Sequence, residues 1–316
     1  MSIANKKIVT LIPSATEIVS FLGKKESIVG RSHECDYPNG LNDAVELTSA
    51  KINVSGTSGE INKEINNILE NSLSVYKVDV EKLKKINPDF IVTQAHCEVC
   101  AVSFSDVEDI VFKYLNKKTK IISLQPNKLD EVFDDISRVA KELNVDNAIS
   151  KGLIQSLKTR IENIKCKTIK LKKKPTVACI EWIDPLMIAG NWIPEMVDIS
   201  GGSNISGQPG KNSHWIKFNE IKNQNPDIII FLPCGFNIKK TKEELDELLK
   251  KDKSWESLKA FKNKKLFVAD GNQYFNRPGP RLVDSIEIFA EIINPKLFHF
   301  KYEKKGWINY HNNYRN

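Results

Sequence analysis

The sequence predicts an α/β protein made of two Rossmann-like lobes with parallel sheets, joined by one long bridging α-helix. Three observations support this fold class. They are a long amphipathic stretch near the middle of the chain, a similar helix–strand–turn unit on either side of it, and a length of 316 residues, which suits about two domains. We expect an N-terminal lobe over residues 1–143, the bridging helix and a linker over 144–174, a C-terminal lobe over 175–295 and a tail over 296–316.

The stretch from Asp146 to Cys166 predicts the bridging helix. Apolar residues recur there every three to four positions, which places one apolar stripe along a helix. Asp146 can cap the first turn, and Lys165 and Lys167 complement the partial negative charge of the last carbonyls. At about 1.5 Å per residue such a helix is about 30 Å long, enough to hold two lobes apart. The alternative is an ordinary crossover helix inside one domain, and the flanking sequence decides between the two.

The flanks carry a matching unit. Residues 83–92 lead to Cys97 and residues 221–230 lead to Cys234, and each segment contains Asn-Pro-Asp before an apolar run. Because proline cannot continue a helix and a short apolar run suits a buried parallel strand, each segment reads as helix, strand and turn. This match favours two related lobes over one large sheet.

The remaining elements follow from local patterns, since apolar runs between turn residues predict strands and three-to-four spacing predicts helices. Strands are expected over 8–12, 27–31, 90–93, 121–124, 176–180, 228–232 and 266–269. Helices are expected over 61–69, 129–143, 240–250 and 281–293, with two more that end at Gly23 and Gly201. At the helix that ends at Gly23, Ser14 suits the N-cap, with Glu17 three residues later as in a capping box. Backbone donors at that helix start can also face a ligand.

Cysteine content and the N-terminal residues indicate a compartment. Cys97 and Cys100, two of the six cysteines, are too close together to brace a fold by closing a long loop. The first apolar run imitates a signal peptide, but polar residues and Pro13 interrupt it and no small-residue cleavage site follows. We therefore expect reduced thiols in the cytoplasm, with a periplasmic or other extracytoplasmic location as the alternative. No run approaches the roughly 18 apolar residues that span a bilayer.

The net charge of +7 does not favour a nucleic-acid partner, because the densest basic run, 165–174, lies in the expected linker and has no interleaved aromatic residues. Residues 207–213 fail as a phosphate-binding Walker loop, since Ile205 replaces its first glycine and Asn212 its hydroxyl residue. No hydrolase motif occurs, and no catalytic residue is predicted. A non-enzymatic protein is favoured, and we expect a monomer.

Candidate site residues follow the strands of both lobes. Open parallel sheets bind ligands at the carboxyl ends of their strands, and clefts between domains are favoured small-molecule sites. In the first lobe the residues at this edge are Ser14, His33, Cys35, His96, Cys97 and Cys100. In the second lobe they are Glu181, Trp182, Trp192, Cys234, Tyr274 and Arg277. If the bridging helix sets the two edges face to face, these side chains line one cleft.

Some of these residues have the chemistry of metal ligands. Cys97 and Cys100, with His33 and Cys35, offer the ligand types of zinc, iron or another thiophilic metal. The alternative, which is slightly favoured, is a set of small buried thiols at strand ends, because free cysteine packs as a small hydrophobe.

The second lobe offers aromatic and cationic groups. Trp182, Trp192, Tyr274 and Phe275 can stack on a broad flat ligand or pack in the core or at its rim. Arg277 can pair with a carboxylate or phosphate of a ligand, or with an aspartate of its own lobe.

The sequence also resembles a known family. Residues 8–23 (IVTLIPSATEIVSFLG), the Asn-Pro-Asp strand entries and the bridging helix resemble the cobalamin and iron-chelate substrate-binding proteins of ABC importers. The blocks at 32–38, 97–102, 190–195 and 270–280 are similar to a subgroup usually labelled cobalamin-binding protein. The resemblance covers residues 5–295.

This resemblance implies that cobalamin, a related corrinoid or another metal chelate binds between two lobes that move little, with aromatic side chains against the ring. It implies an ABC-transporter membrane subunit as partner. His33 would coordinate cobalt or hydrogen-bond to the corrin edge. The other ligand contacts would be Ser14, Trp182, Trp192, Cys234, Tyr274 and Arg277.

A second hypothesis comes from a different class. The chain can be a cytoplasmic metal-site protein, either an enzyme or a metal-handling factor, that uses His33, Cys35, Cys97 and Cys100 on the same scaffold. No reaction follows from it, because no pair of nucleophile and base is visible from spacing.

Overall fold

A computed structural model describes residues 6–70, 75–94, 104–115, 118–205 and 207–313. The chain forms two compact units. Unit 1 comprises residues 1–56, 60–126 and 130–156, and unit 2 comprises residues 57–59, 127–129 and 157–316. Within the described ranges, no helix combines the length and the apolar character needed to cross a membrane.

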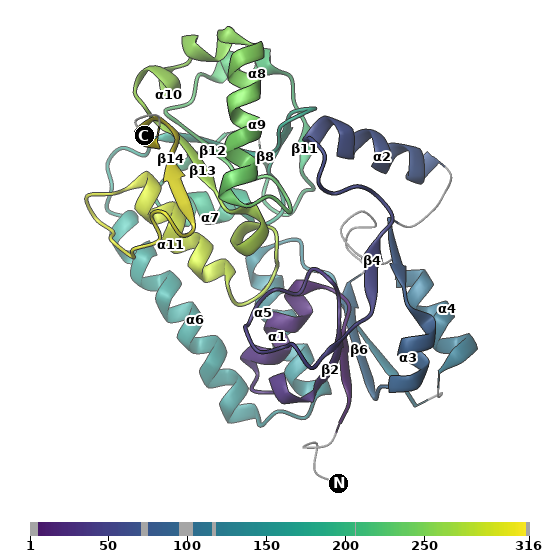
Figure 1. Ribbon diagram of the computed structural model, residues 1–316. Helices are drawn as coiled ribbons and strands as arrows, with labels where there is room; N and C mark the ends of the chain where they lie inside the picture. The colour runs from purple at the N-terminus through teal and green to yellow at the C-terminus, as the bar shows by residue number, and fades with distance from the viewer. Residues whose placement is uncertain (1–5, 71–74, 95–103, 116–117, 206, 314–316) are drawn as a thin grey trace. The chain divides into compact units, whose positions relative to one another are not determined.

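Unit 1 is built on a parallel sheet. Its strands are β1 (Ile8–Thr10), β2 (Ile28–Arg31), β3 (Val45–Glu46), β6 (Phe90–Gln94) and β7 (Lys120–Leu124), in the order β3-β2-β1-β6-β7 (Figure 1). Every pairing between neighbours is parallel. The chain first adds β2 and β3 on one side of β1 and later adds β6 and β7 on the other. The strand order therefore reverses between β1 and β6, and open sheets bind ligands at the carboxyl ends of such strands.

Helices and a small second sheet complete unit 1. The helices are α1 (Pro13–Phe21), α2 (Ser58–Glu70), α3 (Val80–Ile86), α4 (Phe104–Tyr114) and α5 (Leu129–Glu142), with a 3-10 turn at Lys25–Ser27. The second sheet pairs β4 (Thr48–Ala50) with β5 (Tyr76–Val78) in antiparallel register. Side chains of β1, β6, α3 and α4 pack into one buried cluster that includes Val9, Ile91, Leu83 and Val107.

The capping box expected at Ser14 is wrong. Helix α1 begins at Pro13, Ile12 holds the N-cap position, and no side chain caps the first turn. Proline suits the first helical position because the N–H that it lacks would have no partner there. Ser14 therefore lies inside the first turn, where its hydroxyl does not serve as a cap.

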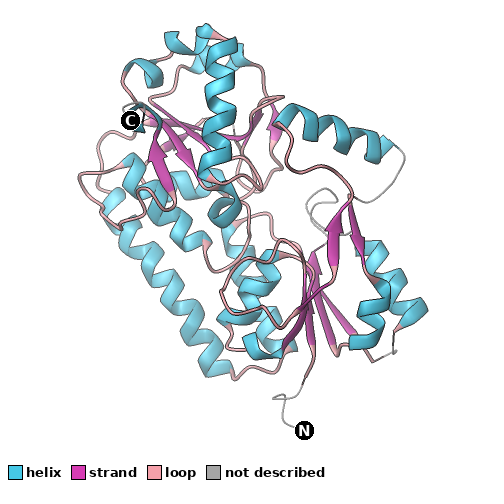
Figure 2. Ribbon diagram, viewed as in Figure 1, coloured by secondary structure: helices cyan, strands magenta, loops and turns pink. Residues whose placement is uncertain are grey.

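Unit 2 has a mixed sheet with parallel strands in its middle. The strands are β8 (Thr176–Trp182), β9 (Met187–Ile188), β10 (Ser203–Asn204), β11 (His214–Trp215), β12 (Ile228–Phe231), β13 (Leu266–Ala269) and β14 (Trp307–Asn309). The order is β11-β9-β8-β12-β13-β14, with β10 paired to β8. Figure 2 draws the strands in magenta and the helices in cyan. β8, β12 and β13 pair in parallel, whereas β9, β11 and β14 add antiparallel edges. The expected α/β fold class is confirmed, and the C-terminal residues supply β14.

The helices of unit 2 cover this sheet. They are α7 (Ile193–Ile199), α8 (Phe218–Gln224), α9 (Ile238–Lys251), α10 (Lys259–Lys262) and α11 (Leu282–Ile293). Single turns lie at Lys253–Ser257, Gly271–Phe275 and Tyr310–Asn313. The core gathers residues from the central strands and from the loops beyond them, including Ile229, Phe231, Trp255 and Tyr310.

The bridging helix is α6 (Asn147–Thr168), 22 residues long, and the division between the units falls within it. Asp146 caps it as expected, because its Oδ1 accepts hydrogen bonds from the backbone N–H groups of Ala148 and Ile149 at 2.8 and 3.1 Å. The expected apolar stripe is buried only in the second half, at Leu157, Ile161 and Ile164, whereas Ile149 is 58% exposed. The periodicity thus located the helix correctly and overestimated how much of it is covered.

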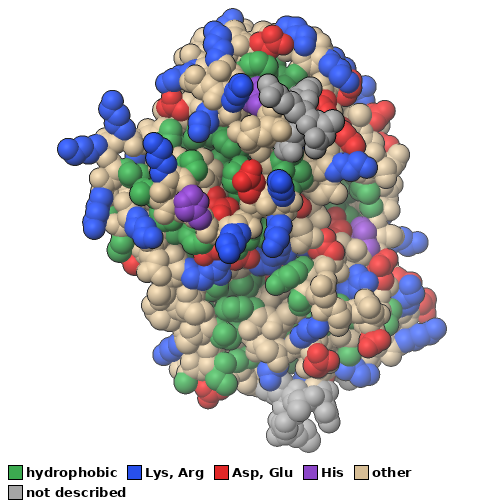
Figure 3. Space-filling view, turned by 60° about the vertical axis from the view of Figure 1, so that its left-hand side comes forward, with side chains coloured by type: hydrophobic (Ala, Val, Ile, Leu, Met, Phe, Trp, Pro, Cys, Tyr) green, Lys and Arg blue, Asp and Glu red, His purple; other side chains and the backbone are tan. Residues whose placement is uncertain are grey.

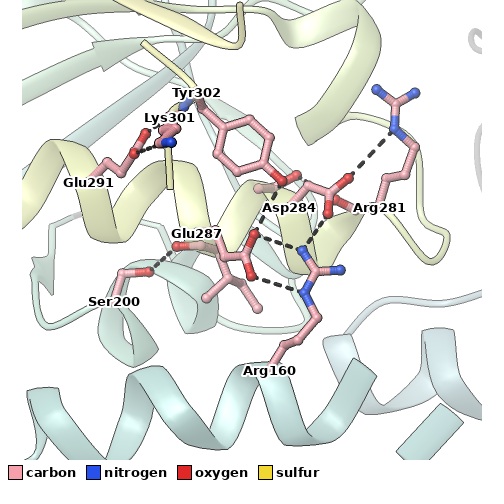
Figure 4. Close-up of polar contacts among 10 residues, drawn as sticks. Arg160, Ser200, Arg281, Asp284, Glu287, Glu291, Lys301 and Tyr302 are labelled. Atoms are coloured by element: carbon pink, nitrogen blue, oxygen red, sulfur yellow. Dashed lines mark hydrogen bonds and ion pairs between the residues drawn. The ribbon is translucent and has the colours of Figure 1, made fainter. Parts of the chain in front are cut away.

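Ion pairs join the second half of α6 to α11. Figure 4 shows Arg160 pointing from α6 toward Asp284 and Glu287. Its Nε and Nη2 donate to Glu287 at 2.9 and 2.7 Å, and Nη2 also donates to Asp284 at 2.6 Å. The hydroxyl of Tyr302 donates to the same Glu287 carboxylate at 3.1 Å. The network therefore ties the bridging helix and the C-terminal segment to one buried carboxylate.

The chain carries a net charge of +7. On the face in Figure 3, Lys and Arg side chains lie in separate groups with Asp and Glu among them. Several lysines pair with acids one helical turn away, as in Lys113–Asp109 and Lys242–Asp246, both at 2.8 Å. Exposed pairs of this kind contribute about 0–1 kcal/mol each.

Candidate functional site

At the carboxyl edge of the unit 1 sheet lie two buried hydroxyls. Ser14, in the first turn of the helix that follows β1, is 1% exposed, and Thr93, near the end of β6, is fully buried. Neither hydroxyl oxygen has a hydrogen-bond partner in the part of the chain that the structure describes. An unsatisfied buried hydroxyl costs about 1–3 kcal/mol. Thr93 lies on β6 and Ser14 on the helix that follows β1, and the sheet order reverses between these two strands, so a polar ligand group there would satisfy both hydroxyls.

His33 belongs to a hydrogen-bonded cluster after β2. Its Nδ1 lies 2.7 Å from Thr48 Oγ1, and its backbone N–H donates to the same oxygen at 3.0 Å. Thr48 Oγ1 donates to Ser32 Oγ at 2.9 Å. The imidazole ring packs on Tyr76 with 5.5 Å between ring centroids, and the Tyr76 hydroxyl donates to Glu34 at 2.9 Å. The half-buried His33 ring is therefore held by β4 and β5 as well as by its own loop.

The side chain of Cys35 points into the interior of unit 1. Its thiol is buried and accepts a hydrogen bond from Thr16 Oγ1 at 3.0 Å, and Thr16 Oγ1 lies 2.7 Å from Thr10 Oγ1. The described residues contain no group of three or more His, Cys, Asp or Glu side chains that could hold a metal ion. His96, Cys97 and Cys100 lie outside the described residues. The zinc or iron site therefore stays a prediction.

At the carboxyl edge of the unit 2 sheet, Trp182 ends β8. Its ring packs on Phe236 at 5.2 Å between centroids, and its Nε1 donates to the Asp184 carbonyl at 3.1 Å. The neighbouring Glu181 accepts from Ser213 Oγ at 2.7 Å. Cys234, which follows β12, is a half-buried free thiol.

Trp192 and Arg277 are almost fully buried. Trp192 is 5% exposed, and its Nε1 donates to the Phe275 carbonyl at 2.9 Å. Arg277 is also 5% exposed and donates to Asn272 Oδ1 at 2.9 Å. Both side chains fix the loop after β13. Their contact with a ligand stays a prediction, and these bonds indicate that they shape the loop.

Tyr274 is the accessible aromatic residue of this loop. It is half-buried, and the Arg281 guanidinium lies 4.6 Å from its ring centroid, a cation–π contact that sequence reasoning missed. Burial raises the pKa of the Tyr274 phenol, so it stays protonated and able to donate. Arg281 itself donates to Gln273 Oε1 at 3.0 Å. Arg281 lies one residue before α11, and no sequence motif there indicated a contact with Tyr274.

Sequence reasoning also missed Lys240. Its ammonium lies 4.1 Å from the Phe236 ring centroid, and burial lowers its pKa. In the sequence it looks like one more lysine of a charged surface helix. Only the fold brings it to the ring that packs on Trp182.

The fold and these edges define an α/β ligand-binding protein whose parallel strands carry polar side chains at their carboxyl ends. A family profile described as periplasmic binding protein matches residues 8–272, and the chain belongs to that family. The resemblance to substrate-binding proteins of ABC importers is thereby confirmed.

Individual relatives agree with this family. The chain is 24% identical over 303 residues to YvrC, an uncharacterized ABC transporter substrate-binding lipoprotein of Bacillus subtilis, covering 93% of this chain and 81% of the relative. It is 27% identical over 201 residues to the high-affinity heme uptake system protein IsdE of Staphylococcus aureus, covering 60% of this chain and 62% of that one.

Solved structures share the fold. The structure of S. aureus IsdE complexed with heme has a TM-score of 0.66 at 20% identity and covers 92% of this chain and 99% of its own. The periplasmic vitamin B12 binding protein BtuF of Vibrio cholerae has a TM-score of 0.65 at 15% identity, covering 93% and 98%. At these identities the likeness establishes the architecture and leaves the ligand open.

The expected cytoplasmic location is wrong. The relative YvrC is named a substrate-binding lipoprotein, and the family to which the chain belongs is described as periplasmic. The prediction relied on cysteine content and on the first residues of the chain, whereas the correction comes from the family match over residues 8–272.

Proposed function

We propose that the protein is the substrate-binding protein of an ABC importer and captures cobalamin, a related corrinoid or another metal chelate outside the cytoplasm. Family membership over residues 8–272 carries this proposal. Relatives and matched structures are named for heme and for vitamin B12, which are both flat macrocyclic metal chelates. The partner is then the membrane subunit of the transporter.

In unit 1 the proposed contacts are the hydroxyl of Ser14 and the ring of His33. A macrocycle of this kind carries carboxylates or amides at its rim, and the Ser14 hydroxyl would donate to one of them. That bond would satisfy a group that has no partner among the described residues.

In unit 2 the proposed contacts are Tyr274 and Cys234, which are both half-buried. The Tyr274 ring offers an apolar face, and Arg281 packs against it. Trp182, Trp192 and Arg277 would support these contacts from behind, because their side chains donate hydrogen bonds to Asp184, Phe275 and Asn272 of the protein itself.

Titration of the purified protein tests the proposal. Cobalamin, cobinamide and heme are added separately to about 100 μM protein while heat and absorbance are recorded. Useful capture needs a Kd of about 1 μM, or about 8 kcal/mol, which both readouts detect at this concentration. Mass spectrometry of compounds that copurify from a host supplied with corrinoids identifies the ligand. An absence of heat and of spectral change with every probe would contradict the proposal.

A further inference from the structure

The hydrogen bonds around His33 determine which ring nitrogen carries a proton. A hydroxyl group can donate one hydrogen bond and accept two. The hydroxyl of Thr48 donates to Ser32 Oγ at 2.9 Å and accepts from the backbone N–H of His33 at 3.0 Å. Its one remaining capacity, toward His33 Nδ1 at 2.7 Å, is as an acceptor. Nδ1 must therefore be the protonated nitrogen, and the lone pair of the neutral ring is on Nε2.

The same contacts fix the direction of the ring. Tyr76 packs against the imidazole, and its own hydroxyl is bonded to Glu34 at 2.9 Å. Thr48 and Tyr76 lie on paired antiparallel strands. The hydroxyl that accepts from His33 and the ring that packs on it are therefore held in one rigid pair of strands. Among the described residues, none forms a hydrogen bond or ion pair with Nε2. The half-buried ring thus keeps one Lewis-basic nitrogen in a fixed orientation.

We infer that His33 binds the metal of the captured chelate through Nε2, with Thr48 and Ser32 holding the ring in the required tautomer. Metal-binding histidines ordinarily donate their other ring N–H to an oxygen in this way, which fixes the tautomer and raises the basicity of the ligand nitrogen. The inference rests on the proposed function and deepens it, because it specifies the ligand.

The ligand class is a chelate whose metal keeps an exchangeable axial position. A corrinoid cobalt or a porphyrin iron meets this condition. A chelate that already fills every coordination position of its metal offers nothing to Nε2. The metal of the chelate would lie next to Nε2 of His33. An axial water molecule would leave the metal for solvent, and Nε2 would take its coordination position.

Electron paramagnetic resonance of the bound probe tests the inference. The probe is cobinamide, a corrinoid without an attached nucleotide base, reduced to Co(II) and added to protein made with either ordinary or nitrogen-isotope-labelled histidine. Axial imidazole gives a nitrogen splitting that changes with the isotope. We expect this splitting in the wild type and its loss in His33→Ala, with a rise in Kd of at least about tenfold. His299→Ala, at an exposed histidine, is the matched control and should leave both unchanged.

Variants at Thr48 separate ligation from simple support of the loop. Thr48→Val removes the acceptor for Nδ1–H and should weaken cobinamide binding about 10–100-fold and reduce the splitting, whereas Thr48→Ser restores both. Thermal unfolding checks that each variant is folded. If His33→Ala does not fold, an isotope-dependent splitting that Thr48→Val alters and Thr48→Ser restores supports the inference.

The outcomes distinguish this inference from the proposed function. If cobinamide binds without an isotope-dependent splitting, or the splitting persists in His33→Ala, axial ligation by His33 is wrong while chelate capture stands. If cobinamide, cobalamin and heme all fail to bind the wild type, the proposed function fails and the inference with it.

Discussion

Replacing Ser14 with alanine separates folding from ligand binding. The hydroxyl is buried and has no hydrogen-bond partner in the described part of the chain. Leaving such a group unsatisfied costs about 1–3 kcal/mol, and the substitution removes that cost together with the packing of a single atom. The Ser14→Ala protein without ligand should therefore be as stable as the wild type, or more stable by up to about 1 kcal/mol, a rise in Tm of roughly 2–4 °C for a unit of this size.

Ligand affinity should change in the opposite direction. If the hydroxyl donates to the chelate, its removal costs about 0.5–1.5 kcal/mol of binding, which raises Kd roughly 2–13-fold. Thermal unfolding without ligand and titration with cobinamide or heme measure the two effects. The matched control is Ser20→Ala, because Ser20 lies at the other end of α1 and its hydroxyl is likewise buried without a partner among the described residues. It should not alter Kd.

Two results would refute this reasoning. A loss of more than about 1 kcal/mol in the unfolding free energy of Ser14→Ala would mean that the hydroxyl stabilises the free protein. An unchanged Kd for a probe that binds the wild type would remove Ser14 from the ligand contacts.

Three further predictions concern the framework. Arg160→Ala should lower the free energy of unfolding by about 1–3 kcal/mol, less than for a fully buried pair because the guanidinium is partly exposed, and adding Glu287→Gln should recover part of the loss in chemical denaturation. Hydrogen bonds from lysine side chains lower the pKa values of Asp89 and Asp227, so their contribution is complete above the unfolded value of about 4 and is lost as pH falls below it. Asp89→Asn should therefore flatten the acid limb of a stability–pH profile, and an unchanged limb would contradict this. Asn87 has a φ of 45°, so Asn87→Ala should cost about 1 kcal/mol while Asn87→Gly is nearly neutral in thermal unfolding.

The elements with strong local periods could be predicted from the sequence. Strand β13 coincides with the expected run 266–269, and α6 begins and ends within two residues of the expected bounds. These elements can be recognised from the sequence because the hydrophobic pattern of their own side chains determines which face is buried. For the stretch from 41 to 80 the sequence predicts only the helix over 61–69 and none of the strands, for the opposite reason. Its strands β3, β4 and β5 are two or three residues long, so pairing with distant partners determines them.

The candidate site was only partly predictable. The rule for parallel sheets placed Ser14 and His33 at the carboxyl edge, because that rule needs only strand order. It could not show that Thr48 Oγ1 holds both the backbone N–H and the Nδ1 of His33, since Thr48 lies 15 residues later, on a short strand that no local pattern predicts. Nor could composition show that the Trp192 indole bonds to Phe275, which lies 83 residues away. Such partners follow from tertiary packing, which no local pattern encodes.

The Asn-Pro-Asp motif occurs once in each unit, and its structure explains why it helps to predict the carboxyl edge of both sheets. In each unit an asparagine in the left-handed conformation ends a helix, with φ of 45° at Asn87 and 44° at Asn225, and the proline prevents the helix from continuing.

The aspartate then sets the register of the sheet. Oδ2 of Asp89 accepts the backbone N–H of Lys7 at 2.9 Å, and Oδ2 of Asp227 accepts that of Thr176 at the same distance. In both sheets the residue after the aspartate pairs with the residue after that donor, Phe90 with Ile8 and Ile228 with Val177. The motif thus fixes where the strand starts and against which neighbour. Because the start of the strand is fixed, its length determines which residues lie at the carboxyl edge. The motif at the amino end of each strand therefore helps to position the candidate site at the carboxyl end.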